Sequence, residues 1–211
     1  MILKRSKMMS SFTIILCPCV STVIRPVYRM KILIGVTGSV ATIKLSELIS
    51  KLRSRKPGVE IRVITTSHAR WFLENQDLQA EAIYSDESEW SAWKQKGDPI
   101  LHIELRKWAD VFLIAPLSAN TLAKFSNGLC DNLLTSVVRA WDPKKKMIVC
   151  PAMNTCMWEN PITSRQLGIV REIYAAEIVP PKEDYVLACG DRGTGAMASV
   201  DTIAHVVLSN D

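Results

Sequence analysis

The sequence predicts an α/β fold: a single doubly wound domain with helices on both faces of a mostly parallel sheet. From Met30 onward, short runs of apolar and β-branched residues alternate with segments whose apolar residues recur at helical spacing. The sequence shows no internal repeats and no linker-like segment that would divide this alternation. A length of 211 residues is enough for one domain with a sizeable core. Strand–helix alternation of this kind implies three layers, α/β/α.

Five apolar runs predict the strands of the sheet. Each is short and rich in β-branched residues, and several end in proline or in small residues. The runs are "KILIGV" (31–36), "EIRVITT" (60–66), "DVFLIAP" (110–116), "KMIVCP" (146–151) and "AEIVPP" (176–181).

The segments between these runs predict helices. Apolar residues recur at helical spacing over 39–55, and Pro57 and Gly58 then stop the helix. Ser67 and Ser199 are placed to cap two further helices, the second of which closes the chain over 199–210. Helices are also predicted over 118–128 and 131–141, whereas the polar segment 74–100 predicts a short strand and an irregular excursion.

The charge is unevenly placed along the chain. The formal net charge is +5, but residues 1–29 hold five of the 26 basic residues and none of the 21 acidic ones. The body over 30–211 is therefore neutral, which argues against a nucleic-acid partner. A membrane span is not expected either, because no stretch approaches the roughly 18 uncharged apolar residues that it needs.

Residues 1–29 are predicted to form a basic N-terminal extension, disordered or targeting, in front of the domain at 30–211. The stretch resembles a short signal or transit peptide, or an extension ahead of a natural start at Met30. The six cysteines form no C-x-x-C pair and no zinc-ligand spacing, so we expect no metal. Free thiols suit a cytoplasmic location, and the alternative is an organelle to which residues 1–29 target the protein.

Small polar residues follow three of the predicted strands. "GVTGSVA" (35–41), "TTS" (65–67) and "APLSANTLAK" (115–124) place hydroxyls and helix starts where a doubly wound sheet binds ligands. Helix capping and tight turns account for some of them without a ligand. Together they suggest a mononucleotide-sized ligand with a single phosphate and a polar ring.

Three further segments carry chemically useful side chains. In "PAMNTCMWENP" (151–161), Asn154 lies close to thioethers and an indole, which suits a carboxylate pocket, or a helix cap beside core residues. His102 has the side chain suited to proton transfer near neutrality, although a lone histidine is more often structural. Cys189 lies in "LACGDRGTGAMA" (187–198), a run rich in small residues. Such a segment allows the backbone to approach a reversibly bound ligand closely.

These motifs resemble those of the homo-oligomeric flavin-containing cysteine decarboxylases, in particular the phosphopantothenoylcysteine decarboxylases. The resemblance extends over about 30–205 and is most specific in "PAMNTCMW" and "LACGDRGTGAMA". It implies a flavodoxin-like fold, FMN as cofactor, a small-molecule substrate and a homotrimer whose active sites are shared between subunits.

The resemblance also implies roles for individual residues. His102 would be the active-site base and Cys189 the proton donor, on a flap that closes over the substrate. Asn154 would grip the substrate carboxylate, with Met157 and Ala188 beside it. The FMN site would be lined by Gly38, Ser39, Val40, Thr65, Thr66, Ser67, Ser118, Ala119, Asn120, Thr121 and Ala152.

The implied reaction is the decarboxylation of 4'-phosphopantothenoylcysteine to 4'-phosphopantetheine in coenzyme A biosynthesis. Oxidation of the substrate thiol to a thioaldehyde by the flavin would permit CO2 loss. The reduced flavin would then return a hydride while Cys189 supplies a proton, which completes the cycle. The alternatives are a peptidyl-cysteine decarboxylase that stops at the enethiol, a phosphatase-regulatory flavoprotein and a flavin electron carrier. The presence of Cys189 weighs against the peptidyl-cysteine decarboxylase, and a chain end without an acidic tail weighs against the phosphatase regulator. An electron carrier would not need Asn154.

Overall fold

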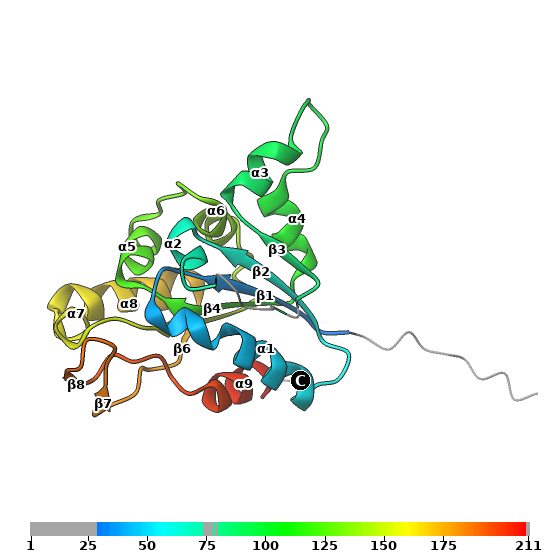
Figure 1. Ribbon diagram of the computed structural model, residues 1–211. Helices are drawn as coiled ribbons and strands as arrows, with labels where there is room; N and C mark the ends of the chain where they lie inside the picture. Colours follow the sequence, from blue (N-terminus) through cyan, green and yellow to red (C-terminus); the bar gives the residue numbers. More distant parts are fainter. Residues whose placement is uncertain (1–28, 74–77, 79, 210–211) are drawn as a thin grey trace, which may run out of the picture.

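A six-stranded parallel sheet forms the centre of the protein. The structure, a computed structural model, describes residues 29–73, 78 and 80–209 (Figure 1). The sheet order is β3-β2-β1-β4-β5-β6, which confirms the predicted doubly wound α/β fold. The strands are β1 (Lys31–Val36), β2 (Glu60–Thr65), β3 (Ala82–Tyr84), β4 (Val111–Leu117), β5 (Lys146–Pro151) and β6 (Glu177–Ile178).

Helices cover both faces of the sheet (Figure 1). One face packs against α1 (Leu45–Arg55) and α9 (Val200–Leu208), around a core that includes Ile34 and Val63. The other face carries a second core, around Phe112, beneath four helices. These are α4 (Leu101–Trp108), α5 (Ala119–Asn127), α6 (Leu133–Arg139) and α8 (Pro161–Tyr174). Because both faces are covered, β1, β4 and β5 are almost entirely buried and read as continuous apolar runs.

The predicted helix over 39–55 begins as a tighter turn. The segment η1 (Val40–Lys44) is a 3-10 helix that continues into α1. In α2 (Ser67–Arg70), the predicted cap at Ser67 is wrong: Thr66 is the extended N-cap residue and Ser67 is the first helical residue. The closing helix agrees with prediction, since the Ser199 hydroxyl accepts a hydrogen bond from the backbone N–H of Thr202 at 3.0 Å.

Four of the helices that the structure describes were not assigned from the sequence: α3, α4, α7 (Thr155–Glu159) and α8. The first is α3 (Asp86–Ala92), which replaces part of the irregular excursion expected over 74–100. It has a Ser85–Ser88 capping box but no buried apolar stripe. Without apolar residues at helical spacing, its sequence does not show the pattern that predicts a helix. Of the others, α4 and α8 lie over the second core.

The C-terminal part of the chain adds a small hairpin. The predicted strand at 176–181 is reduced to β6, because Pro180 and Pro181 have no N–H group to pair with the sheet. The chain then forms an antiparallel pair, β7 (Tyr185–Val186) and β8 (Arg192–Gly193), with Lys182 bridged to Ala196 at its base.

The predicted extension at 1–29 lies outside the described residues except for Arg29. None of the helices described is long and apolar enough to cross a membrane. In the same part of the chain, His, Cys, Asp and Glu side chains form no group of three or more that could hold a metal ion.

Candidate active site

Two adjoining cavities open beyond the carboxyl ends of β1, β4 and β5. The larger has a volume of about 830 Å³ and the smaller about 680 Å³. Ser39, Ala152 and Met153 line both, so ligands in the two cavities would lie side by side. This edge includes the boundary between β1 and β4, where the order of the sheet reverses and doubly wound proteins bind ligands.

Most residues predicted for a cofactor site line the larger cavity. They are Gly38, Ser39, Thr66, Ser67, Ser118, Ala119, Asn120, Thr121 and Ala152. Val40 lines only the smaller cavity, and Thr65 lines neither. The Thr65 side chain is buried inside the sheet edge, and its hydroxyl donates to the backbone carbonyl of Tyr84 at 3.3 Å.

The start of α5 presents backbone N–H groups to the larger cavity. Ser118 is the extended N-cap residue, and its hydroxyl oxygen accepts a hydrogen bond from the Thr121 N–H at 3.3 Å. The first turn of a helix carries partial positive charge, which favours an anionic group such as a phosphate.

Thr37 joins the two loops that carry these residues, and sequence reasoning did not identify it. Its hydroxyl donates to the carbonyl of Pro116 at 2.8 Å and accepts from the N–H of Ser118 at 2.8 Å. Its own carbonyl accepts from the Thr42 hydroxyl at 2.8 Å. Thr37 and Thr42 are fully buried, so the loops after β1 and β4 are held together.

One buried hydroxyl in the larger cavity lacks a partner. Among the described residues, no group forms a hydrogen bond with Thr66 Oγ1, although this atom is buried. Buried hydroxyls are seldom left unpaired, so the atom points to a polar ligand group at this place. Together with the start of α5 and the volume of the cavity, Thr66 shows that the residues present fit a flavin mononucleotide.

The smaller cavity brings Asn154 and Cys189 together. Asn154 precedes α7 (Thr155–Glu159) and caps it, because its Oδ1 accepts from the Cys156 N–H at 2.9 Å. Its Nδ2 is thereby directed toward Cys189 Sγ, to which it donates at 3.5 Å. Ala188 also lines this cavity, whereas Met157 lines the larger one.

Close packing requires two of the glycines in the Cys189 segment, Gly193 and Gly195. A Cβ atom at Gly193 would lie 2.4 Å from Thr155 Oγ1, and one at Gly195 would lie 2.2 Å from the carbonyl oxygen of Met153. The Met153 N–H also donates to the Gly195 carbonyl at 3.0 Å. The hairpin therefore lies directly on the backbone that carries Asn154.

His102 lies elsewhere in the chain. It is in the first turn of α4, and its Nδ1 forms a hydrogen bond with the carboxylate of Glu89 in α3. Because a carboxylate can only accept, a neutral ring carries its proton on Nδ1 and keeps Nε2 as an acceptor. His102 lines neither cavity, so one chain does not bring it to Asn154 and Cys189.

Lys124 and Asp131 form an ion pair at the rim of the larger cavity. The hydrogen bond from Lys124 lowers the pKa of the Asp131 carboxyl below its ordinary value. The carboxylate thus stays charged at neutral pH and balances the lysine.

A family model described as Flavoprotein matches residues 21–210. The chain belongs to the Flavoprotein family. Membership agrees with the site, because the larger cavity fits a flavin. Sequence reasoning reached this edge of the sheet from the polar residues after the strands. It missed Thr37 and Glu89, which act through other residues and carry no motif.

Several known proteins are similar over most of this chain. It is 50% identical over 190 residues to a phosphopantothenoylcysteine decarboxylase of Mus musculus, covering 90% of this chain and 91% of the relative. A PPC decarboxylase cysteine-to-serine variant, complexed with pantothenoylaminoethenethiol, superposes with a TM-score of 0.80 and 47% identity. That match covers 85% of this chain and 97% of the other. The FMN binding protein AtHal3 has a TM-score of 0.78 and 48% identity, over 85% and 95% of the two chains.

Proposed function

We propose that this protein is an FMN-dependent decarboxylase that converts 4'-phosphopantothenoylcysteine to 4'-phosphopantetheine. The observation that carries the proposal is the pairing of Asn154 with Cys189 in a cavity that adjoins a flavin-sized one. The mouse relative, half identical over nearly the whole chain, is a phosphopantothenoylcysteine decarboxylase.

The larger cavity would hold the cofactor. The first turn of α5, with Ser118, is suited to the phosphate, and Thr66 offers its unpaired hydroxyl to a polar atom. When bound, FMN supplies reversible hydride acceptance, which lets a substrate carboxylate without its own electron sink leave as CO2.

The side chains of the smaller cavity would bind and protonate the substrate. Asn154 Nδ2 is the donor for the substrate carboxylate, since its Oδ1 is already engaged by α7. Cys189 Sγ would be the proton donor that completes the product, and its exposed position at the hairpin tip lets a bound substrate reach it. A peptidyl-cysteine decarboxylase that stops at the enethiol would not need this thiol.

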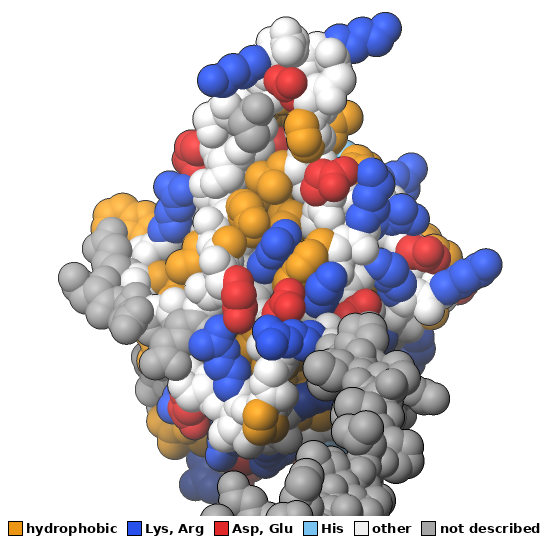
Figure 2. Space-filling model, turned by 90° about the vertical axis from the view of Figure 1, so that its right-hand side faces the viewer, with side chains coloured by type: hydrophobic (Ala, Val, Ile, Leu, Met, Phe, Trp, Pro, Cys, Tyr) orange, Lys and Arg blue, Asp and Glu red, His pale blue; other side chains and the backbone are white. Residues whose placement is uncertain are grey.

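We further propose a homotrimer in which His102 of one subunit completes the site of a neighbour. His102 lies in the first turn of α4, and Figure 1 shows α3 and α4 projecting on the side away from the β7–β8 hairpin. Trp90 and Trp93 of this projection are 79% and 51% exposed. Large apolar side chains exposed together on a protein surface often mark a contact with another subunit. Figure 2 shows hydrophobic side chains gathered beneath the tip of the projection, above a region of mixed charge.

Subunit mixing would test the shared site. His102→Asn and Asn154→Asp variants, each inactive alone, are unfolded together, refolded and assayed. A shared site predicts that mixed trimers regain part of the wild-type activity, because some sites receive both intact residues. Unrestored activity in a mixed trimer verified by native mass spectrometry would place both residues in one subunit's site.

A reducing compartment, such as the cytoplasm, is proposed from the cysteines. Those that the structure describes (Cys130, Cys150, Cys156 and Cys189) are free thiols. Burial raises the pKa of the Cys150 thiol, which therefore stays protonated in the core.

The proposed activity is tested by incubating the FMN-loaded protein with 4'-phosphopantothenoylcysteine and weighing the product. Loss of CO2 alone is the expected result. Loss of CO2 and two hydrogens would instead indicate an enethiol-forming enzyme. An unchanged substrate, with a folded and yellow protein, would refute the decarboxylase proposal.

A further inference from the structure

Lys182 is unusual among the charged residues that line the smaller cavity. Lys44 is paired with Glu47 at 2.9 Å, and Asp201 is paired with Lys51 at 3.0 Å. Lys182 has no carboxylate partner among the residues that the structure describes. Its Nζ lies 4.4 Å from the centre of the Tyr185 ring, so an aromatic face orients it.

The neighbours of Lys182 do not neutralise it through an ion pair. Asp184, two residues away, is held by Arg192 at 2.6 and 2.8 Å. Among the described residues that line the cavity, Lys182 is therefore the ammonium group that remains available to an anionic ligand.

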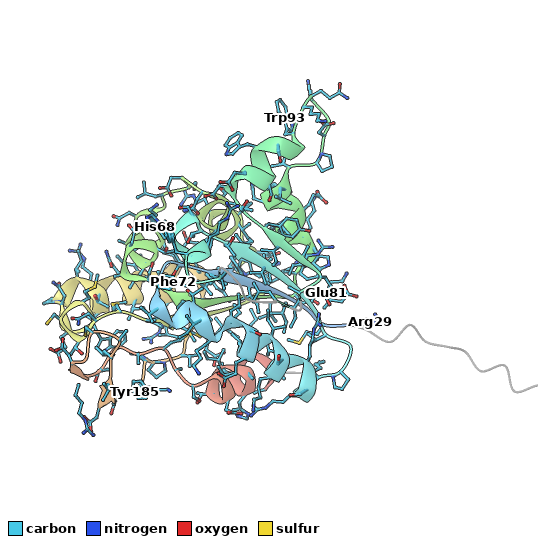
Figure 3. All side chains as sticks on the ribbon, in the orientation of Figure 1. Arg29, His68, Phe72, Glu81, Trp93 and Tyr185 are labelled. Atoms are coloured by element: carbon cyan, nitrogen blue, oxygen red, sulfur yellow. The ribbon has the colours of Figure 1, made fainter. Side chains whose placement is uncertain are left out.

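Lys182 and Cys189 lie at opposite ends of the hairpin. Lys182 is bridged to Ala196 at its base, and the tip is closed by hydrogen bonds between Leu187 and Asp191 and between Leu187 and Gly190. The five residue-to-residue steps from Lys182 to Leu187 span at most about 16 Å at roughly 3.3 Å per step. Figure 3 shows Tyr185, the residue beneath Lys182 Nζ, projecting from this hairpin.

This upper limit on the length of the hairpin is compatible with the length of the substrate of the proposed function. In 4'-phosphopantothenoylcysteine, the pantothenoyl arm separates the phosphate from the cysteine by roughly 13 Å, at about 3.5 Å for every three bonds of extended chain. With the cysteine carboxylate at Asn154, the phosphate would reach the Lys182 end of the same cavity.

We infer that Lys182, held over the Tyr185 ring, forms the subsite that binds the substrate's phosphate monoester. The inference rests on the proposed function and deepens it. It assigns to Lys182 the preference for a phosphorylated substrate, which the Asn154–Cys189 pair cannot provide because it acts on the cysteine end.

The test compares 4'-phosphopantothenoylcysteine with unphosphorylated pantothenoylcysteine in wild-type, Lys182→Met and Lys182→Arg proteins. Methionine keeps the apolar stem and removes the charge. For Lys182→Met we expect kcat/KM on the phosphorylated substrate to fall about tenfold, mainly through KM, as for loss of a charged hydrogen bond. The value for pantothenoylcysteine should stay within about twofold of wild type. Lys182→Arg should retain most of the preference for phosphate.

Lys144→Met is the matched control, since Lys144 is exposed and lines neither cavity. It should leave the preference unchanged. Binding of 4'-phosphopantetheine and of pantetheine to the FMN-loaded proteins, measured by calorimetry, gives a second readout without turnover. FMN content and melting temperature establish that each variant is folded.

Equal losses on both substrates, or a preference that survives in Lys182→Met, would overturn the phosphate subsite. The same holds if the Lys144 control loses the preference, or if wild type does not distinguish the two substrates. If wild type decarboxylates neither substrate, the proposed function itself fails, and this outcome is distinct from all of these.

Discussion

The side-chain amide of Asn154 donates a hydrogen bond to the sulfur of Cys189 at 3.5 Å, although 35 positions separate them. Two local features produce this contact. Asn154 is fixed by capping α7, and Gly195 lets the hairpin pack against the carbonyl of Met153. The same amide and thiol thus face one cavity from two sides.

Cys189→Ser is expected to stop the reaction at the enethiol. A serine hydroxyl is a far weaker acid than a thiol, so the last protonation fails while CO2 loss continues. Mass spectrometry should find a product lighter than 4'-phosphopantetheine by two hydrogens. Full conversion to 4'-phosphopantetheine by this variant would remove Cys189 from the proton-donor role.

Two substitutions at Asn154 separate its cap from its amide donor. Asn154→Asp keeps the oxygen that caps α7 but removes Nδ2 and adds a charge that repels the substrate carboxylate. We expect near-wild-type melting and a fall in kcat/KM of at least about tenfold. Asn154→Ala should lose a similar amount of activity and also about 1 kcal/mol of stability. An active Asn154→Asp enzyme would show that the amide does not bind the carboxylate.

Thr66→Val tests the orphaned hydroxyl. Removing a buried, unpaired oxygen should leave the apo-protein as stable as wild type or slightly more so. FMN affinity should fall about fivefold, as expected for one hydrogen bond of roughly 1 kcal/mol. Fluorescence titration with FMN measures this.

Thr65→Val is the control for Thr66→Val. It breaks the bond to the Tyr84 carbonyl and should lower stability by about 1 kcal/mol without changing FMN affinity. The assignment of Thr66 is contradicted if its variant binds FMN as tightly as wild type.

Asp201 contributes stability that depends on pH. The hydrogen bond from Lys51 lowers the pKa of its carboxyl, and Arg55 adds to the effect. Since the folded pKa lies below the unfolded one, the contribution is present above the unfolded pKa and is lost as pH falls through the folded value.

Asp201→Asn should therefore melt slightly below wild type at pH 7, because it loosens the contact of α1 with α9. The difference should shrink as the pH falls below about 4, the ordinary pKa of aspartate. Thermal melts from pH 7 to pH 3 measure it. A difference in melting temperature that does not vary with pH would rule out the ion pair as its cause.

Sequence reasoning determined the class of fold and the edge of the sheet where the site lies. The buried runs at 31–36 and 146–151 are apolar because both of their faces are covered, and this pattern is local. The polar residues that follow the strands are also a local pattern. Nine of the eleven residues predicted to line the cofactor site line the larger cavity.

Only the tertiary structure decided which residues meet. Thr65 and Thr66 are adjacent in sequence, yet their hydroxyls differ. The Thr65 hydroxyl donates to the Tyr84 carbonyl in the sheet, whereas the buried Thr66 hydroxyl has no partner among the described residues. How distant segments pack decides three features of the site: the contact of Asn154 with Cys189, the separation of His102 from both, and the unpaired charge of Lys182. Short-range patterns report burial and helix ends, whereas a site is made by contacts between segments that are far apart along the chain.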